Sequence, residues 1–430
     1  MFLLSLPALA KILLTFALIL LLSRFLPLFA CLFIGSVAIG LWMGATPWMI
    51  LGTIWNNVTD SQTLSLVTVI ILIMVFSALL EKSGQLKRIV SSFQAVSPGP
   101  RFTMAAMPAL IGLLPMPGGA LFSAPMVEAA TEKRNVGPEV KVAINYWFRH
   151  VWEYWWPLYP GIILAASLFA PEGWKVIAAQ SLLSIGALAG GVLFILSGVP
   201  KLAAEPEGVP RSGGWSAFAA EITPIAVVIL IFGGLQALVE GARLLIGFAG
   251  QWPSYNSLFL GLVAAIGLVM HRGSLGYANL RDTVLNSGIS SIVMIVFAVM
   301  AFKGMLIESK AIEQVRWDLA QYHIPPVVMM ALLPFVAGMV VGLAVGFVGS
   351  SFPLVVALIP PGESAIPYGI LAFGFGFTGM MLSPVHLCML VSRQYFCADF
   401  LLSYRFLWKP VLLGISWTIF LYLLFKAIMS

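Results

Sequence analysis

The stretch Ser123-Ala124-Pro125-Met126-Val127 has a counterpart 228 positions later, Ser351-Phe352-Pro353-Leu354-Val355. Three further pairs recur in the same order at separations of 226 to 227 positions: Leu80-Glu81 with Ile307-Glu308, Met107-Pro108-Ala109 with Leu333-Pro334-Phe335, and Pro157 with Pro384. Short apolar strings recur by chance, but several pairs in one order at one spacing indicate a duplicated chain. Two related halves with Gly- or Pro-interrupted segments at matching places are typical of secondary transporters, whose binding site lies between the halves.

The composition indicates a membrane protein. Hydrophobic residues make up 60% of the 430 positions and charged residues only 9%, whereas soluble domains carry roughly 25% charged residues. The bilayer is therefore the expected partner, and the net charge of +6 indicates basic cytoplasmic loops and no nucleic-acid binding. Cys31, Cys388 and Cys397 show no metal-ligand spacing, so we expect apolar filler, no metal and no cofactor.

Two apolar segments cannot be read as simple spans. Residues 102–130 are interrupted by Leu114-Pro115-Met116-Pro117-Gly118-Gly119, which leaves two arms shorter than the about 20 residues that a span needs. This pattern predicts a re-entrant hairpin over 102–130. The matching hairpin is predicted over 326–359, with residues 346–351 as its turn.

Loop charges give the expected orientation. Both flanks of the first hairpin are basic: Lys82, Lys87, Arg88 and Arg101 precede it, and Lys133, Arg134 and Lys141 follow it. Basic loops favour the cytoplasm, so the hairpin should return to its own side. We therefore predict an all-α polytopic membrane protein built from two inverted repeats of about five spans each. The repeats are 1–200 and 217–430, joined by a cytoplasmic linker at 201–216, and both termini are outside.

The hairpin tips are the first candidate binding elements. Two prolines and two glycines cannot continue a helix, and a helix N-terminus at membrane depth can offer amides to an anion. The candidate substrate-binding residues are Pro117, Gly118, Gly119 and Ser123 in the first half, and Gly349, Ser350 and Ser351 in the second. The alternative is a tight loop between two interfacial helices.

We predict a helix over 142–170 that is broken at Pro157. On a continuous helix Arg149 and Glu153 would share a face, with Asn145 one turn away. Ionisable residues at this depth are usually functional, so we expect Asn145 and Arg149 to bind substrate, and His150 and Glu153 to carry the coupling ion. The alternative is an interfacial aromatic belt with Arg149 snorkelling to the surface.

The second broken helix is predicted over 367–391. Ser383 and His386 lie at its break, beside Pro384, and His386 could titrate near neutral pH. The alternative for His386 is a hydrogen-bonded packing residue. The chain has no HExxH, GxSxG or Walker motif, so we do not expect an enzyme or an ATP-driven pump.

The strings Gly112-Leu113-Leu114-Pro115-Met116-Pro117-Gly118-Gly119, Phe148-Arg149-His150-Val151-Trp152-Glu153 and Ser383-Pro384-Val385-His386-Leu387-Cys388 resemble a family of uncharacterised prokaryotic integral-membrane proteins. That family is similar to the ion-transporter superfamily of gluconate permeases, citrate and dicarboxylate carriers and arsenite exporters. The resemblance implies a homodimer in the inner membrane that binds substrate between hairpin tips. The chain lacks the Ser-Asn-Thr that sodium-coupled dicarboxylate carriers have at these tips.

We therefore expect a secondary transporter of a small organic anion, coupled to protons, with Na⁺ as the alternative ion. Two other functions stay open. The chain could export an inorganic oxyanion or a metalloid, or it could be a membrane scaffold that transports nothing. A scaffold would not need matched helix breaks, so the repeat argues against it.

Overall fold

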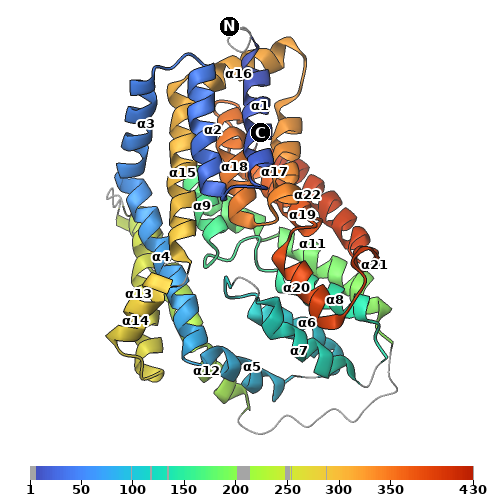
Figure 1. Ribbon diagram of the computed structural model, residues 1–430. Helices are drawn as coiled ribbons and strands as arrows, with labels where there is room; N and C mark the ends of the chain where they lie inside the picture. The colour runs from blue at the N-terminus through green and yellow to red at the C-terminus, as the bar shows by residue number, and fades with distance from the viewer. Residues whose placement is uncertain are drawn as a thin grey trace.

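The computed structural model of the protein describes residues 6–97, 99–116, 119–132, 135–200, 214–246, 252, 254–286 and 288–429. In these residues all regular secondary structure is helical (Figure 1). The prediction of an all-α protein is therefore confirmed. Most of the predicted linker lies outside the described residues, and the second half begins with a helix at Gly214, three residues before the predicted boundary at 217.

Each half contributes eleven α-helices within the described residues. The first half contains α1 (Ala8–Leu22), α2 (Leu28–Trp42), α3 (Pro47–Thr59), α4 (Ser61–Lys82), α5 (Gln85–Gln94), α6 (Pro100–Ile111), α7 (Ala120–Thr131), α8 (Pro138–Arg149), α9 (Pro160–Leu168), α10 (Gly173–Gln180) and α11 (Leu183–Gly190), which continues in irregular helical turns to Gly198. The second half contains α12 (Gly214–Ile246), α13 (Ser254–Arg272), α14 (Tyr277–Asn286), α15 (Ile289–Glu308), α16 (Ala311–Gln321), α17 (Pro326–Val341), α18 (Ala344–Leu358), α19 (Ile366–Met381), α20 (Leu387–Phe396), α21 (Phe400–Tyr404) and α22 (Trp408–Met429).

The two halves repeat the same helix order in opposite directions. α15 begins 228 positions after α4, and α20 begins 227 positions after α9. In Figure 1, α4 leads from α3 near the top to α5 at the bottom, whereas α15 leads from α14 at the bottom to α16 at the top. The opposite directions of α4 and α15 agree with the inverted repeats that the sequence predicts.

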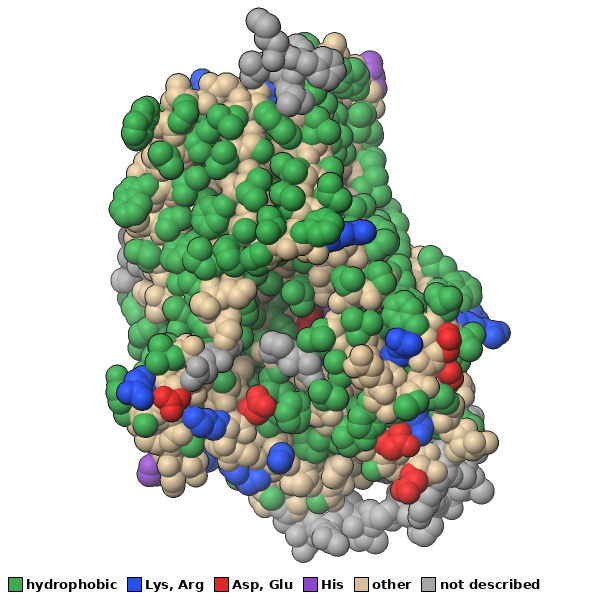
Figure 2. Space-filling view, viewed as in Figure 1, with side chains coloured by type: hydrophobic (Ala, Val, Ile, Leu, Met, Phe, Trp, Pro, Cys, Tyr) green, Lys and Arg blue, Asp and Glu red, His purple; other side chains and the backbone are tan. Residues whose placement is uncertain are grey.

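Several helices are long and apolar enough to cross a bilayer. Within the described residues there are six such segments: α4, Gly173–Gly198, α12, Tyr255–Arg272, α15 and Phe400–Met429. α16 and α17 form a further pair bent by 116°. Hydrophobic side chains cover the upper half of the face in Figure 2, and most visible charged side chains lie in its lower half. The protein is thus a polytopic membrane protein.

The first hairpin pair is present at the predicted place. α6 and α7 pack against each other and are joined by residues 112–119. Each arm has 12 residues, about 18 Å at 1.5 Å per residue, which is too short to cross a hydrocarbon core of about 30 Å. Pro117 and Gly118, two of the predicted tip residues, lie outside the described residues.

The second hairpin, α17 and α18, has a turn that differs from the predicted one. α17 ends at Val341, and Gly342 takes a left-handed conformation with φ +67° before α18 begins at Ala344. Residues 346–351, the predicted turn, lie inside α18 instead. The predicted turn was wrong because the chain leaves the helix at Gly342, whereas the hydroxyls of Ser350 and Ser351 donate to the carbonyls of Gly346 and Phe347 inside α18.

Both predicted broken helices are interrupted, but the first breaks earlier than expected. α8 ends at Arg149, eight residues before Pro157, and the chain resumes as α9 at Pro160. The side chains of Arg149 and Glu153 therefore do not share a helical face, and that part of the prediction was wrong. In the second half, α19 ends at Met381 and α20 begins at Leu387, so the break surrounds Pro384 as predicted.

Candidate functional site

A cavity of about 160 Å³ lies where the two hairpin tips meet the two broken segments. The broken segments are the stretches between α8 and α9, residues 150–159, and between α19 and α20, residues 382–386. α4 and α15 each add one apolar wall residue. The lining residues are Met74, Pro115, Met116, Arg149, His150, Glu153, Tyr159, Pro160, Gly161, Ile292, Leu343, Ala344, Val345, Met380, His386, Leu387 and Cys388. In Figure 1 the two hairpins approach this region from opposite ends of the molecule. Both halves thus contribute a tip and a break to one site.

Arg149, the last residue of α8, is the cation of this cavity. Its side chain is 2% exposed, and Nη2 donates a 2.8 Å hydrogen bond to the carbonyl of Met116 at the first tip. Within the part of the chain that the structure describes, Nε and Nη1 have no hydrogen-bond partner. Gly119 lets the guanidinium lie against the hairpin, since a Cβ on Gly119 would come within 2.2 Å of Nη2. Arg149 is buried and does not snorkel to the membrane surface.

The aromatic run after Arg149 explains why the helix breaks there. The indole nitrogens of Trp152 and Trp156 donate to the carbonyls of Ala109 and Leu113, at 2.9 and 3.0 Å. The hydroxyl of Tyr159 donates to the carbonyl of Gly112 at 2.5 Å. These carbonyls belong to the C-terminal end of α6, where a helix leaves acceptors without partners. The broken segment therefore fastens the first hairpin, which the alternative of an aromatic belt at the surface does not explain.

Glu153 and His150, the predicted coupling residues, lie on the irregular segment. Both are buried, with exposed fractions of 8% and 2%, and His150 Nε2 lies 3.9 Å from Glu153 Oε1. The ion pairs of the described residues include none between Arg149 and Glu153 within 4 Å. A carboxylate close to an imidazole, on the wall of a cavity, can exchange a proton with it.

The second broken segment places His386 against His150. The two ring centroids are 4.8 Å apart at an angle of 85°. Ser383 lies just outside the cavity lining, and its carbonyl accepts a hydrogen bond from Tyr404. From the sequence we predicted that Cys388 is a small apolar packing residue, but it lines the cavity beside both histidines. The signal available in the sequence was its position two residues after His386, at a helix break.

Ser123 and Asn145, two predicted binding residues, are fully buried but do not line the cavity. Ser123 Oγ donates to Asn145 Oδ1 at 2.6 Å, and Asn145 Nδ2 donates to the carbonyl of Ala120 and to Ser392 Oγ. Their hydrogen bonds join α7, α8 and α20. The pair therefore links the first hairpin to the broken helix of the second half.

Gly349, Ser350 and Ser351 are likewise buried away from the cavity lining, in the middle of α18. A Cβ on Gly349 would come within 2.6 Å of Val299 Cγ2 on α15. Their place at the second tip is taken by Leu343, Ala344 and Val345, which line the cavity at the start of α18. The described lining residues of both tips are apolar, and the first tip also accepts the hydrogen bond from Arg149 through the carbonyl of Met116.

Among solved structures, the fold is similar to one described as "Crystal structure of the Alcanivorax borkumensis YdaH transporter reveals an unusual topology". The two chains share 15% sequence identity, the match covers 88% of each, and the TM-score is 0.57. At this identity the likeness concerns the fold. None of the curated proteins compared with the chain matches it. A family profile matches residues 6–247 and 255–425, nearly the whole chain, and on that evidence the chain belongs to the family described as "Protein of unknown function (DUF401)".

Proposed function

We propose that the protein is a secondary transporter that binds a small organic anion between its two hairpin tips. The observation that carries this proposal is the guanidinium of Arg149, which is buried at the cavity and whose Nε and Nη1 have no partner among the described residues. A buried donor without an acceptor costs roughly 1 to 3 kcal/mol. An anion in the cavity would remove that cost, because a carboxylate can accept from two guanidinium donors at once.

The rest of the lining favours an organic anion over the alternative of an inorganic oxyanion or metalloid. Met74, Ile292, Leu343 and Val345 present apolar surface to the cavity. A substrate with a carbon body would bury that surface, whereas a bare oxyanion would leave it in contact with water. Of the described lysines and arginines, only Arg149 is in the lining. A substrate with one negative charge would therefore be balanced by Arg149, whereas a second negative charge would have no cation to pair with there.

The inverted order of the two halves supports alternating access. Rocking of one half against the other around a fixed site exposes it to each side in turn. In this proposal, Glu153 with His150 carries the coupling proton, because both lie on the segment that also holds Arg149. Na⁺ is the alternative coupling ion. A prokaryotic inner-membrane homodimer is proposed on the family resemblance. The alternative of a membrane scaffold does not explain why the guanidinium of Arg149 is buried at a cavity.

The test is ligand-induced stabilisation across a library of mono- and dicarboxylates, hydroxy acids, phosphate, sulfate, arsenate and arsenite. A ligand at 100 times its Kd stabilises the folded state by about 2.7 kcal/mol, so a binder should raise the Tm of the detergent-purified protein. We expect monocarboxylates to give the largest shifts. The strongest binder is then radiolabelled for counterflow uptake in proteoliposomes.

Two arginine variants make the test specific. Arg149→Lys keeps the charge but removes the planar pair of donors, so binding should weaken at least 10-fold. Arg393→Lys is the matched control, because Arg393 lies on α20 outside the cavity lining and donates to the carbonyl of Ala398. Stabilisation that is equal in wild type and Arg149→Lys would overturn the proposal. Stabilisation by oxyanions alone would favour the inorganic alternative.

A further inference from the structure

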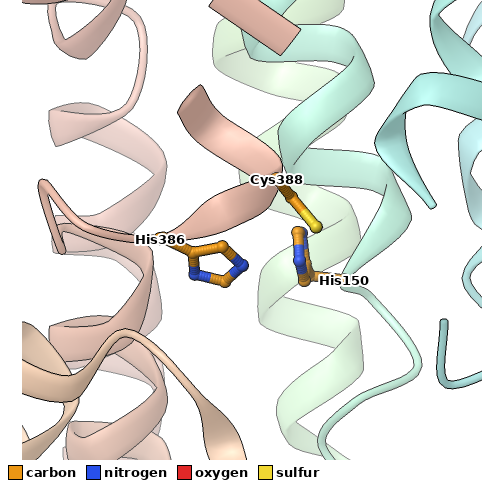
Figure 3. Close-up of side chains that lie close together, drawn as sticks. All are labelled: His150, His386 and Cys388. Carbon is orange, nitrogen blue, oxygen red and sulfur yellow. The ribbon is translucent and has the colours of Figure 1, made fainter. Parts of the chain in front are cut away.

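We propose that His150, His386 and Cys388 form a binding site for a thiophilic metal ion, Zn²⁺. The three side chains are buried, and their ligand atoms all lie within 4.8 Å of one another. Figure 3 shows the two imidazole rings next to each other, with the sulfur of Cys388 directed towards the ring of His150. His150 directly follows α8 in the first half, whereas His386 directly precedes α20 in the second half and Cys388 lies in the first turn of α20.

The distances are close to those of a zinc site. An ion at the centre of a triangle with sides of 4.8 Å lies about 2.8 Å from each corner, and Zn–N and Zn–S bonds are about 2.0 to 2.3 Å. Each ligand atom therefore has to move inward by less than about 1 Å. Movements of this size need only small side-chain rotations. Two imidazoles and a thiol suit Zn²⁺, and they suit Mg²⁺ or Ca²⁺ poorly.

The backbone already orients both histidines for this role. Nδ1 of His150 lies 2.5 Å from the carbonyl of Tyr146, and Nδ1 of His386 lies 3.4 Å from the carbonyl of Met380. A carbonyl next to Nδ1 holds the proton there, which leaves the lone pair of Nε2 as the ligand. Histidine ligands of metals are usually fixed by such a contact. The structure therefore supplies the outer partners as well as the ligands.

The charges near the site offset those of a divalent ion only in part, because one cation accompanies the two anionic groups. Arg149 is the cation in the same cavity lining and opposes metal binding, whereas Glu153 favours it. Cys388 loses its proton when it binds a metal, so the thiolate adds a second negative charge. Glu153 Oε1, 3.9 Å from His150 Nε2, or a water molecule in the cavity can take the fourth tetrahedral position.

A bound ion would join the broken segments of the two halves. If the halves move against each other during transport, Zn²⁺ should lock them and inhibit uptake. This consequence rests on the proposed transport function, but binding itself does not. Binding is therefore measured on the purified protein in detergent, where a failure to bind metal is distinct from a failure to transport.

The experiment is a competition between the chelator-stripped full-length protein and a chromogenic zinc chelator. We expect one Zn²⁺ per chain in wild type, and at least 100-fold weaker binding in Cys388→Ser and in His386→Gln. Co²⁺ should give a thiolate-to-metal absorption band in wild type that Cys388→Ser lacks. This band reports direct coordination by sulfur, which a merely structural role of Cys388 would not produce.

Matched controls use a cysteine and a histidine outside the cluster. Cys397→Ser and His323→Gln alter residues at exposed positions of the second half, and both should bind Zn²⁺ like wild type. Size-exclusion profiles and Tm values show that each variant is folded. The proposal is overturned if wild type takes up no Zn²⁺, or if monodisperse Cys388→Ser binds it as tightly as wild type does.

Discussion

The two hairpins occupy equivalent places in the two halves but are held in different ways. α17 and α18 are joined by a turn at Gly342 and Leu343, and most of α18 is buried. α6 and α7 are joined by eight residues, 112–119, and are fastened by the aromatic side chains of the broken segment. A hairpin held by packing is rigid, whereas one held by a few hydrogen bonds can be released. We therefore expect the first hairpin to adapt to substrate and the second to stay fixed.

The packing of the second hairpin against its neighbour supports this contrast. A Cβ on Gly338 of α17 would come within 2.1 Å of the carbonyl oxygen of Gly376, and one on Gly379 would come within 2.0 Å of that of Phe335. α17 and α19 thus touch backbone to backbone, which is how small residues bring membrane helices together. The charged residues of the cavity are also divided unequally between the two halves, since Arg149 and Glu153 both belong to the first half.

The largest expected effect tests whether the hairpins enter from opposite sides. In a Cys397→Ser background, which removes the one exposed cysteine of the described residues, single cysteines replace Lys87, Glu132, His323 or Pro361. Positions 87 and 132 flank the first hairpin and should react with an impermeant thiol reagent from the cytoplasm only. Positions 323 and 361 flank the second hairpin and should react from outside only. Opposite sidedness of 87 and 132 would exclude a re-entrant first hairpin.

The second prediction compares one glycine from each hairpin. Gly119→Val should lower counterflow uptake at least 10-fold, because its side chain must displace the guanidinium of Arg149 from the tip. Gly349→Ala instead presses on Val299 in the core, so it should lower the Tm but leave the affinity of the folded protein unchanged. The measurements are uptake and ligand-induced Tm shifts of both monodisperse proteins. Equal loss of affinity in the two variants would contradict the expectation that the first hairpin responds to substrate and the second does not.

Much of the fold could be predicted from the sequence, because helix-breaking residues and apolar length act locally. The ends of the predicted hairpins, 102–130 and 326–359, lie within two residues of the ends of the observed helix pairs. The second turn was misplaced because Gly342 and Gly349 look alike in a sequence, and only packing decides which one leaves the helix. Arg149 was predicted as a binding residue because a charge in an apolar segment stands out.

The remaining site residues could not be assigned from spacing. His150 and Cys388 lie 238 positions apart and meet only when the two broken segments come together. Ser123 and Asn145 are polar residues at a plausible depth, yet they satisfy each other and Ser392 outside the cavity. Local patterns therefore identify polar residues in a membrane segment. They do not tell whether a neighbouring helix or a ligand supplies the hydrogen-bond partner.

The third prediction concerns Glu153, which has no acidic counterpart at the second broken segment, since Met380 lies 227 positions later. If Glu153 carries the coupling proton, Glu153→Gln should abolish accumulation of substrate driven by a pH gradient, while exchange across the membrane continues. Glu308→Gln is the matched control, because Glu308 ends α15 outside the cavity lining. Wild-type accumulation by Glu153→Gln, with wild-type pH dependence, would assign coupling to another residue.

The smallest effect concerns the ion pairs that follow the two hairpins. After the second hairpin, Glu363 accepts hydrogen bonds from Lys426 and Tyr368, and these bonds lower the pKa of its carboxyl group. At the first hairpin, Lys141 of α8 binds Glu128 of α7 at 2.7 Å. Both carboxylates are more than one-third exposed, at 37% and 46%, so neither pair should contribute more than about 1 kcal/mol.

The pair formed by Glu363 should depend on pH. Because the folded pKa of Glu363 is depressed, its stabilisation is complete above the usual carboxyl pKa of about 4.3 and disappears as the pH falls through the folded pKa. The Tm difference between wild type and Glu363→Gln should therefore be constant from pH 6 to 8, about 2 °C or less, and should shrink below about pH 5. Glu128→Gln should lower the Tm less, because Glu128 has a single described partner and its side chain is the more exposed of the two. A difference for Glu363→Gln that grows as the pH falls would mean that its hydrogen bonds do not favour the ionised form.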